Sequence, residues 1–178
     1  MPRYFAFLRG INVGGHKVTM DRLRALFEEL GFARVETFIA SGNVIFDAPA
    51  KTAAKLEPRI EAHLEAALGY AVPTFLRTHP DLVAIAAHPA FPPNDVAQAH
   101  AIHVSFLREP PAPKLTKDLL ALRSPVDEFH VHGREMYWLC RVSILESKVS
   151  DKVLGKAFPV ASTARNMNTI RRIVSKYE

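Results

Sequence analysis

The sequence predicts an α+β protein built from two similar halves with antiparallel sheets. The order strand, helix, strand, strand, helix, strand occurs in residues 1–78 and again in residues 99–178. A proline-rich segment, residues 79–98, separates the two halves. Hydrophobic residues make up 48% of the 178-residue chain, which is enough to give each half a core. This βαββαβ order is the one found in ferredoxin-like, or α/β-plait, subdomains, and a C-terminal helix is added to it.

The first half begins with a strand at Tyr4–Leu8 and a helix that follows Thr19. A threonine hydroxyl at this position accepts a hydrogen bond from a free amide of the first turn, and Gly31 supplies the left-handed residue that ends the helix. The buried face of this helix is expected at Met20, Leu23, Leu26, Phe27 and Leu30.

Two strands, Val35–Ile39 and Val44–Phe46, then flank the turn sequence Ala-Ser-Gly-Asn, and Val72–Arg77 is the last strand of this half. A second helix lies between the hairpin and that strand and ends at Gly69. Because proline has no amide hydrogen to donate, we expect Pro58 to fall in the first turn of this helix. Its apolar face consists of Leu56, Ile60, Leu64 and Leu68.

The connector opens with a short helix, for which Thr78 and Asp81 predict a reciprocal capping box. The second half repeats the element order of the first, without residue-level similarity between the halves, and turns its hairpin at His132-Gly133-Arg134. We expect its strands at Ala101–Leu107, Val126–Val131, Met136–Arg141 and Pro159–Ser162, and its helices at Lys114–Leu122, at Ser147–Leu154 and at the C-terminus, where Met167, Ile170, Ile173, Val174 and Tyr177 share one side.

Composition narrows the class of protein. The one cysteine, Cys140, excludes an internal disulfide and a paired-thiol metal site. The N-terminus lacks the apolar core of a signal peptide, and no apolar run reaches the about 18 residues of a membrane-spanning helix. We therefore expect a soluble, cytoplasmic protein without membrane association.

The net charge of +5 is confined to the second half. Residues 1–98 contain ten Lys/Arg and ten Asp/Glu, whereas residues 99–178 contain thirteen and eight. Two interpretations stay open: a basic end that attracts anionic partners, and an ordinary solvated helix face. The basic residues after Ser150 are Lys152, Lys156, Arg165, Arg171, Arg172 and Lys176.

A glycine-rich loop, Arg-Gly-Ile-Asn-Val-Gly-Gly-His-Lys at residues 9–17, follows the first strand. In a βαββαβ sheet this loop and the turn between the second and third strands lie at the same end. We therefore expect residues 10–17 and 40–43 to be neighbours, and we call the two segments the glycine rim. Its candidate ligand-binding residues are Arg9, Asn12, Gly14, Gly15, Lys17, Ser41, Gly42 and Asn43.

Two interpretations of the glycine rim stay open. Glycine amides beside Lys17 suit an anion, although the spacing differs from the phosphate loop GxxxxGK[ST] and from GxGxxG. The glycines serve equally to let a long loop adopt left-handed backbone angles. Ser41 lacks the GxSxG context of a nucleophile, and neither rim segment contains an Asp or Glu to act as general base. The sequence thus offers no recognisable catalytic constellation.

The eight histidines do not predict a metal site. His130 and His132 share a strand face by their spacing of two, and His100 and His103 lie near another strand, but carboxylate or thiol ligands at set spacings are missing. We expect no metal and no cofactor. His16, in the glycine-rich loop, is the better candidate for a functional histidine.

The segment Ala-Arg-Asn-Met-Asn-Thr, residues 164–169, opens the last helix. Asn166 or Asn168 can cap this helix, and Arg165 lies beside its positive end, where an anion is favoured. Ordinary capping with a solvated basic face is the alternative. These three residues complete the candidate ligand-binding set.

Three stretches resemble the bacterial domain-of-unknown-function family DUF1697: FLRGINVGGHKVTMDRLRALFEELGF, VETFIASGNVIF and STARNMNTIRRI. The resemblance covers essentially the whole chain and implies two ferredoxin-like subdomains, but no reaction. Met167 departs from the family pattern, in which an aromatic residue is more common. The matching positions are Leu8–Gly15, Lys17, Met20, Ser41–Asn43, Arg165, Asn166, Asn168 and Thr169.

The leading hypothesis from the sequence is a small cytosolic protein that binds an anionic ligand, a nucleotide or a nucleic acid, at the glycine rim. Two alternatives stay open. One is an enzyme acting on a phosphorylated or nucleotide substrate at the same rim, with Lys17 as electrostatic stabiliser and Asn12 or Asn43 orienting the substrate. The other is a protein–protein interaction or assembly module, and the oligomeric state is not predicted.

Overall fold

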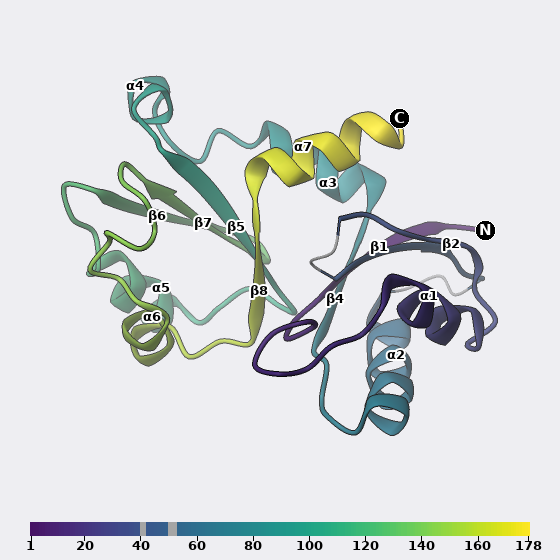
Figure 1. Ribbon diagram of the computed structural model, residues 1–178. Coiled ribbons are helices and arrows are strands. Elements are labelled where there is room, and N and C mark those ends of the chain that lie inside the picture. The colour runs from purple at the N-terminus through teal and green to yellow at the C-terminus, as the bar shows by residue number, and fades with distance from the viewer. Residues whose placement is uncertain (40–41, 50–52) are drawn as a thin grey trace. The chain divides into compact units, whose positions relative to one another are not determined.

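The computed structural model describes residues 1–39, 42–49 and 53–178 (Figure 1). Over these residues the fold is α+β, with two four-stranded antiparallel sheets and seven helices. The predicted class is therefore confirmed. The chain divides into a first unit, Met1–Val83 with Tyr177, and a second unit, Ala84–Lys176 with Glu178. Within the described residues, no helix is long and apolar enough to cross a membrane.

The first unit holds a sheet with the strand order β2-β3-β1-β4. Its central strand β1 pairs with β3 and β4, so that Phe5 lies opposite both Ile45 and Arg77. Helices α1 and α2 contact each other and cover one face of this sheet (Figure 1). The elements are β1 (Arg3–Leu8), α1 (Met20–Glu28), β2 (Ala33–Thr37), β3 (Asn43–Asp47), α2 (Ala53–Leu68), β4 (Thr74–Thr78) and α3 (His79–Ala87), and the division between the units falls inside α3.

The core of the first unit lies between this sheet and its two helices. Alternate residues of β1 point to it, because successive side chains of a strand face opposite sides of the sheet. The residues between them, Phe5 and Phe7, are also buried, so both faces of β1 are covered. The largest side chains of the core are Tyr4, Leu8, Leu23, Leu26, Phe27, Phe32, Phe46, Leu56, Ile60, Leu64 and Leu76.

The predicted helix ends of the first unit are confirmed. The Thr19 hydroxyl accepts a hydrogen bond from the Arg22 amide at 3.1 Å and caps α1. Gly31 ends that helix with a φ of +84°. Thr78 and Asp81 form the reciprocal capping box of α3, with bonds of 2.8 and 3.3 Å.

The predicted place of Pro58 is wrong. Helix α2 begins at Ala53, so Pro58 is its sixth residue and falls beyond the first turn. A proline there removes one intrahelical hydrogen bond. Leu56, Ile60 and Leu64 are almost completely buried around it, and their burial holds the helix in place despite the missing bond.

The second unit repeats the arrangement of the first, with the strand order β6-β7-β5-β8. Helices α5 and α6 contact each other, α5 packs on β6, and α7 contacts β5 and β8. Trp138 and Phe129 stack in its core with ring centroids 5.5 Å apart. The elements are α4 (Pro93–Ala97), β5 (Ala101–Leu107), α5 (Pro113–Leu120), β6 (Asp127–His132), β7 (Glu135–Cys140), α6 (Asp151–Ala157), β8 (Ser162–Asn166) and α7 (Met167–Lys176).

Two elements of the second unit lie later in the chain than predicted. Helix α6 begins after Ser150, whose hydroxyl accepts a hydrogen bond from the Val153 amide, because the hydroxyl of Ser147 is already bonded to Asp127 and to the Val149 amide in the preceding loop. Strand β8 occupies Ser162–Asn166 instead of Pro159–Ser162, because it is there that the chain pairs with β5.

Candidate functional site

The two segments of the glycine rim adjoin, as the strand order requires. The Leu8 amide donates a hydrogen bond to the Gly42 carbonyl at 2.9 Å. Gly42 has a φ of +84°, and a Cβ on it would lie 3.2 Å from the Leu8 Cβ and 3.4 Å from the Ile11 Cβ. A glycine is therefore needed here by both the backbone conformation and the close approach. Ala40 and Ser41 lie outside the described residues.

The two asparagines of the rim hold the backbone. The Asn12 Oδ1 accepts a hydrogen bond from the Val18 amide at 2.7 Å, and Asn12 itself has a φ of +61°. The Asn43 Nδ2 donates to the Phe38 carbonyl at 2.8 Å, and Asn43 is 2% exposed. Asn12 thus closes the glycine-rich loop, and Asn43 closes the β2–β3 hairpin.

Five candidate ligand-binding residues of the rim are exposed: Arg9, Asn12, Gly14, Gly15 and Lys17. Both glycines have positive φ, at +59° and +87°, and a Cβ on either would meet no atom within 4 Å. Their conformation explains the choice of glycine, and two cationic side chains flank them.

His16 packs on an aromatic ring. Its imidazole stacks on Tyr70 with ring centroids 3.7 Å apart and planes at 26°. The Tyr70 hydroxyl is buried and has no hydrogen-bond partner among the described residues. Tyr70 packs against the core of the first unit, so the stack gives His16 a structural role in the loop.

Arg165 is buried in β8, whereas the sequence predicted it beside the positive end of the last helix, where an anion is favoured. It is 8% exposed, and its Nη1 donates to the Thr163 hydroxyl and to the Ala164 carbonyl, both at 2.8 Å. Burial lowers the pKa of the guanidinium to about 10. The alternation of β8 turns its side chain inward, which the helical interpretation of this segment missed.

The first unit contains a counterpart of Arg165 that the sequence comparison of the halves did not reveal. Arg77 is the fourth residue of β4, as Arg165 is of β8, and it is 1% exposed. Its Nη1 also donates to the carbonyl of the preceding residue, Leu76, at 2.8 Å. Each arginine lies in an edge strand that leads directly into a helix. The two units therefore match in element order and also in the position of one buried arginine.

Asn166 caps α7, as predicted for one of the two asparagines. Its Oδ1 accepts a hydrogen bond from the Asn168 amide at 2.9 Å. The Asn168 side chain turns along the helix and accepts a bond from the Arg171 Nη1 at 3.2 Å. The start of α7 therefore presents a cationic guanidinium held by a neighbouring amide.

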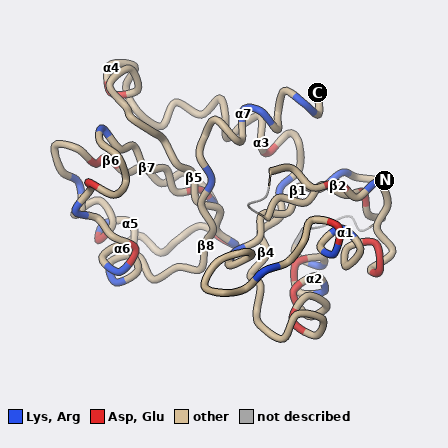
Figure 2. The backbone as a smooth tube through the Cα atoms, viewed as in Figure 1, with Lys and Arg blue, Asp and Glu red and all other residues tan. Residues whose placement is uncertain are grey.

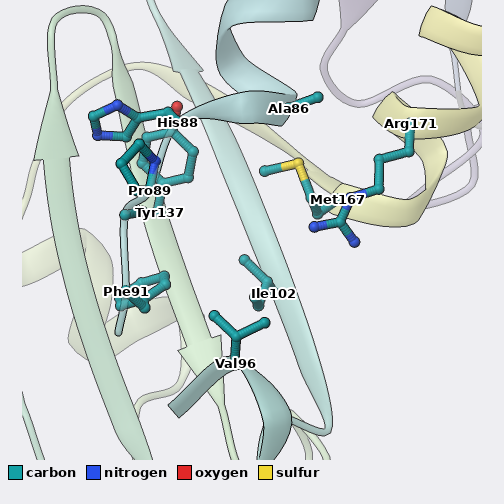
Figure 3. A pocket seen from close by; sticks show the side chains of 10 residues that line it. Ala86, His88, Pro89, Phe91, Val96, Ile102, Tyr137, Met167 and Arg171 are labelled. Atoms are coloured by element: carbon teal, nitrogen blue, oxygen red, sulfur yellow. The ribbon is translucent and has the colours of Figure 1, made fainter. Parts of the chain in front are cut away.

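Two adjoining pockets lie at the start of α7, and both are lined by Val96, Ile102, Met167 and Arg171. We call them together the α7 groove. The polar pocket, of about 140 Å³, adds His100, Asn166 and Asn168. The aromatic pocket, of about 70 Å³, adds His88, Phe91 and Tyr137. Figure 3 shows the aromatic side chains on one side of this pocket and Met167 with Arg171 on the other.

The electrostatic character of the groove follows from α7. This helix contains Arg171, Arg172 and Lys176 and no acidic residue (Figure 2). The helix begins at Met167, directly after its cap Asn166, and its dipole is positive at this end. A cationic side chain and a helix start together favour an anion at the polar end of the groove.

None of the residues that line the aromatic pocket was predicted from the sequence as a ligand-binding residue. They come from α3 and the segment after it, from α4, from β5 and β7, and from α7, which only the folded unit brings together. Of these residues, Arg171 could have been linked to the predicted site from the sequence, because it lies three residues after Asn168 and therefore on the same side of a helix.

A family model described as a protein of unknown function, DUF1697, matches residues 1–137. No curated protein matches the chain. Among solved structures, a conserved bacterial protein from Streptococcus pneumoniae, SP0830, is similar with a TM-score of 0.78 and 23% identity, over 99% of this chain and 98% of that one. This likeness shows a shared fold.

Proposed function

The chain belongs to the DUF1697 family of proteins of unknown function, and from that premise we propose that it binds a small anionic ligand with one planar ring, of the nucleotide class, in the α7 groove. One observation carries the proposal: a cationic polar pocket and an aromatic pocket share four lining residues. A phosphorylated ligand with a ring needs that pairing of environments.

The polar end suits the phosphate. Arg171 offers several N–H donors in a planar fork, and hydrogen bonds from a charged donor to phosphate are about twice as strong as neutral ones. The positive end of the α7 dipole adds to the attraction. Asn168, bonded to Arg171 at 3.2 Å, orients the guanidinium.

The aromatic end suits the ring. Phe91 and Tyr137 line one side of the pocket, and the thioether of Met167 lines the other (Figure 3). Aromatic faces and a polarisable sulfur both contact planar rings favourably. The groove is open and small, so the ligand lies in it with part of its surface in water.

The glycine rim is the second candidate surface for the same class of ligand. Arg9 and Lys17 are exposed on either side of Gly14 and Gly15. Lys17 makes no hydrogen bond or ion pair with any residue that the structure describes, which leaves its charge available to an anion. Asn12 and Asn43 contribute to this surface by holding its shape.

We also propose that each unit is a ferredoxin-like subdomain. The strand orders β2-β3-β1-β4 and β6-β7-β5-β8, all antiparallel, support this assignment, as do the helices that follow the first and third strands of each sheet. The proposal matters for the site, because the α7 groove then lies where the added helix meets strands of the second βαββαβ repeat.

The test is a titration of the protein with a fluorescent ATP analogue and with AMP, ADP and inorganic phosphate at two salt concentrations. We expect saturable binding that weakens with salt. Arg171→Ala should weaken it about tenfold, the effect of losing one charge-assisted hydrogen bond. Arg172→Ala is the matched control, because it removes the same charge from the same helix outside the groove.

The remaining outcomes separate the alternatives. Equal losses of nucleotide affinity in the two arginine variants would show a general charge effect and would overturn the assignment of the site to the α7 groove. A loss confined to Lys17→Ala would move the site to the glycine rim. Tighter binding of a 20-nucleotide single-stranded RNA, with a steeper salt dependence, would favour nucleic acid. Product formation would favour the enzyme, and a mass that rises with concentration would favour the assembly module.

A further inference from the structure

Two histidines of the second unit meet through their ring nitrogens beside the aromatic pocket. His88 lines that pocket and His130 lies in β6, with their Nε2 atoms 2.9 Å apart and their ring centroids 5.1 Å apart. The rings therefore share an N–H···N hydrogen bond, in which one Nε2 donates and the other accepts. Because an accepting nitrogen carries no proton, at least one ring of the pair is neutral whenever this bond is present.

This hydrogen bond leaves the pair room for one proton. Neither ring is hydrogen-bonded to any other described residue, so the Nδ1 lone pair of the donor ring is free. A proton added there gives an imidazolium whose Nε2–H still donates to the neutral partner, and a charged donor strengthens that bond. A second proton would have to take the accepting Nε2, which breaks the bond and sets two charges side by side. The pair thus gains one positive charge as the pH falls.

The groups that face the pair are aromatic or cationic. The ring of His132 stacks on His88 with centroids 4.0 Å apart, and the Tyr137 ring lies 5.5 Å from His88. Arg171 lines the same pocket from α7, on the side opposite His88 (Figure 3). Burial, followed by the neighbouring imidazoles, lowers the pKa of His88 and of His130 below the ordinary value for histidine. The pair is therefore neutral at pH 7 and takes up its proton in mildly acidic solution.

Acidic groups do not cancel this charge inside the groove. Among the described residues that line its two pockets there is no Asp or Glu. The acidic residues of the elements around the pair are Asp81 in α3, Asp95 in α4, Asp127 and Glu128 in β6, and Glu135 in β7. In that order, the first four are bonded to the Thr78 amide, Arg141, Trp138 and Arg123, and the last lies opposite His132. A charge on the pair therefore adds to the positive charge already present in the pocket.

We propose that the His88–His130 pair is the pH sensor of the α7 groove, and that one proton taken up by the pair strengthens the binding of an anionic ligand there. This inference rests on the proposed function and adds its regulation. An anion in the groove favours the charged form of the pair and so raises its pKa, and by linkage the affinity rises as the pH falls through that pKa. At higher pH the pair is neutral, and the attraction comes from Arg171 and the α7 dipole.

The expected size of the effect follows from the openness of the groove. Couplings between two binding sites are typically about 5–150-fold in affinity, and salt and water screen the charges of an open groove. We therefore expect a rise of about fivefold, the lower end of this range. The neighbouring His132 tests the sign, because its imidazole lowers the pKa of both His88 and His130. Replacing it should move the affinity step to higher pH.

The first measurement needs no ligand. The ring nitrogens of His88 and His130 in the full chain are followed by ¹⁵N NMR while the pH is lowered from about 8 to about 5. We expect both rings to change together, with one midpoint below the ordinary histidine pKa of about 6.5, because they share the added proton. Two unrelated midpoints would show two independent histidines and would overturn the sensor.

The second measurement is the affinity for 3′,5′-cyclic AMP, by isothermal titration calorimetry at constant salt between about pH 8 and about pH 5. A cyclic phosphodiester keeps one negative charge over this range, whereas a terminal phosphate changes its charge near about pH 6 and would obscure the step. We expect the affinity to rise about fivefold as the pH falls. Titrations in two buffers of different ionisation enthalpy should show net proton uptake on binding near the midpoint.

Variants assign the step to the pair. The double variant His88→Gln, His130→Gln should bind cyclic AMP with an affinity that no longer changes with pH. His100→Gln removes the other histidine that lines the groove and should keep the step. His63→Gln is the matched control, because His63 is paired with Glu29 in the first unit. Circular dichroism shows whether each variant is folded.

Three outcomes would overturn the sensor: an affinity of the wild type that does not change with pH, a step that survives in the double variant, or a step lost in His100→Gln. Saturable binding without a pH step removes the sensor and leaves the proposed function standing, whereas no binding at any pH removes both. If the double variant does not fold, the ring titration of the wild type and the shift in His132→Gln decide the question.

Discussion

The two units share an element order and a strand order but satisfy the buried aspartate of each sheet differently. In the first unit, Asp47 at the end of β3 is 1% exposed and pairs with the guanidinium groups of Arg3, at 3.0 Å, and Arg34. In the second unit, Asp127 at the start of β6 is fully buried and accepts hydrogen bonds from neutral donors. The common topology therefore fixes where the strands lie and leaves each unit its own polar chemistry.

The same contrast holds for the residues of the two candidate surfaces. In the first unit, the side chains of Asn12 and Asn43 are bonded to the backbone of their own loops. In the second unit, Asn166 and Asn168 also make local bonds, yet both line a pocket together with Arg171. A polar motif in a loop is thus informative about binding when an open cavity lies beside it.

The largest expected effect is that of Asp127→Ala. The carboxylate accepts bonds from the Trp138 Nε1 at 2.9 Å and from the hydroxyls of Ser124, at 3.1 Å, and Ser147, at 3.0 and 2.9 Å. Its removal leaves the buried Trp138 donor and two partly buried hydroxyls without their acceptor, which should cost about 3 kcal/mol or more in the free energy of unfolding. Urea unfolding at pH 7 measures this. Asp118→Ala is the control.

The control fits because the Asp118 side chain is 41% exposed and pairs with Lys114 at the surface. Surface pairs of this kind contribute about 0–1 kcal/mol. Asp127→Asn should fall between the two, since an amide oxygen still accepts some of the bonds. Similar urea unfolding midpoints for Asp127→Ala and Asp118→Ala would show that the hydrogen bonds to Asp127 do not stabilise the second unit.

The next effect is that of Asp47→Asn, and it should depend on pH. Burial raises the pKa of Asp47, but hydrogen bonds from Arg3 and Arg34 outweigh burial and hold it below the ordinary value. A carboxyl whose folded-state pKa is depressed adds stability above its unfolded-state pKa of about 3.9, and this is lost as the pH falls. We expect a loss of about 1–3 kcal/mol at pH 7.

Unfolding measured from pH 7 down to pH 2.5 checks this prediction. The difference between the wild type and Asp47→Asn should shrink below about pH 4, because the wild-type carboxyl then becomes neutral as well. A difference that stays constant over this range would mean that the charge of Asp47 contributes nothing, and the contrast between the two carboxylates would disappear.

The sequence predicted most of the fold because its signals are local. Thr19, Gly31 and the pair of Thr78 with Asp81 mark helix ends through contacts over a few residues, and the structure contains all of these caps. The hairpin turn at Gly133 is equally local, with a φ of +56°. Such features depend on neighbours in the chain and can be predicted from it.

The sequence predicted less of the candidate site because its contacts are long-range. His88 and His130 are 42 residues apart, and the stack of His16 on Tyr70 joins a loop to the end of α2. Arg165 was misplaced because β8 is defined by its pairing with β5 and has no strong pattern of its own. Contacts of this kind follow from the assembled sheet.

A smaller effect is expected for Asn12→Ala, which tests whether the rim asparagine is structural. The variant loses the bond to the Val18 amide and places alanine at a φ of +61°, so we expect a destabilisation of about 1–2 kcal/mol. Asn12→Gly tolerates the backbone angle and should lose less. Nucleotide affinity in the α7 groove should be unchanged in both. Weaker binding without loss of stability would make Asn12 a ligand-binding residue.

The smallest effect is expected for Tyr70→Phe, at the stack that joins the glycine-rich loop to the segment after α2. The Tyr70 hydroxyl is buried without a hydrogen-bond partner among the described residues, so its removal deletes an unsatisfied polar group and keeps the ring against His16. We expect a change between zero and a stabilisation of about 1 kcal/mol in thermal or urea unfolding. His16→Ala, which removes the stack, should instead destabilise. A loss above about 1 kcal/mol in Tyr70→Phe would mean that the hydroxyl is bonded in solution, since only a satisfied group costs that much to remove.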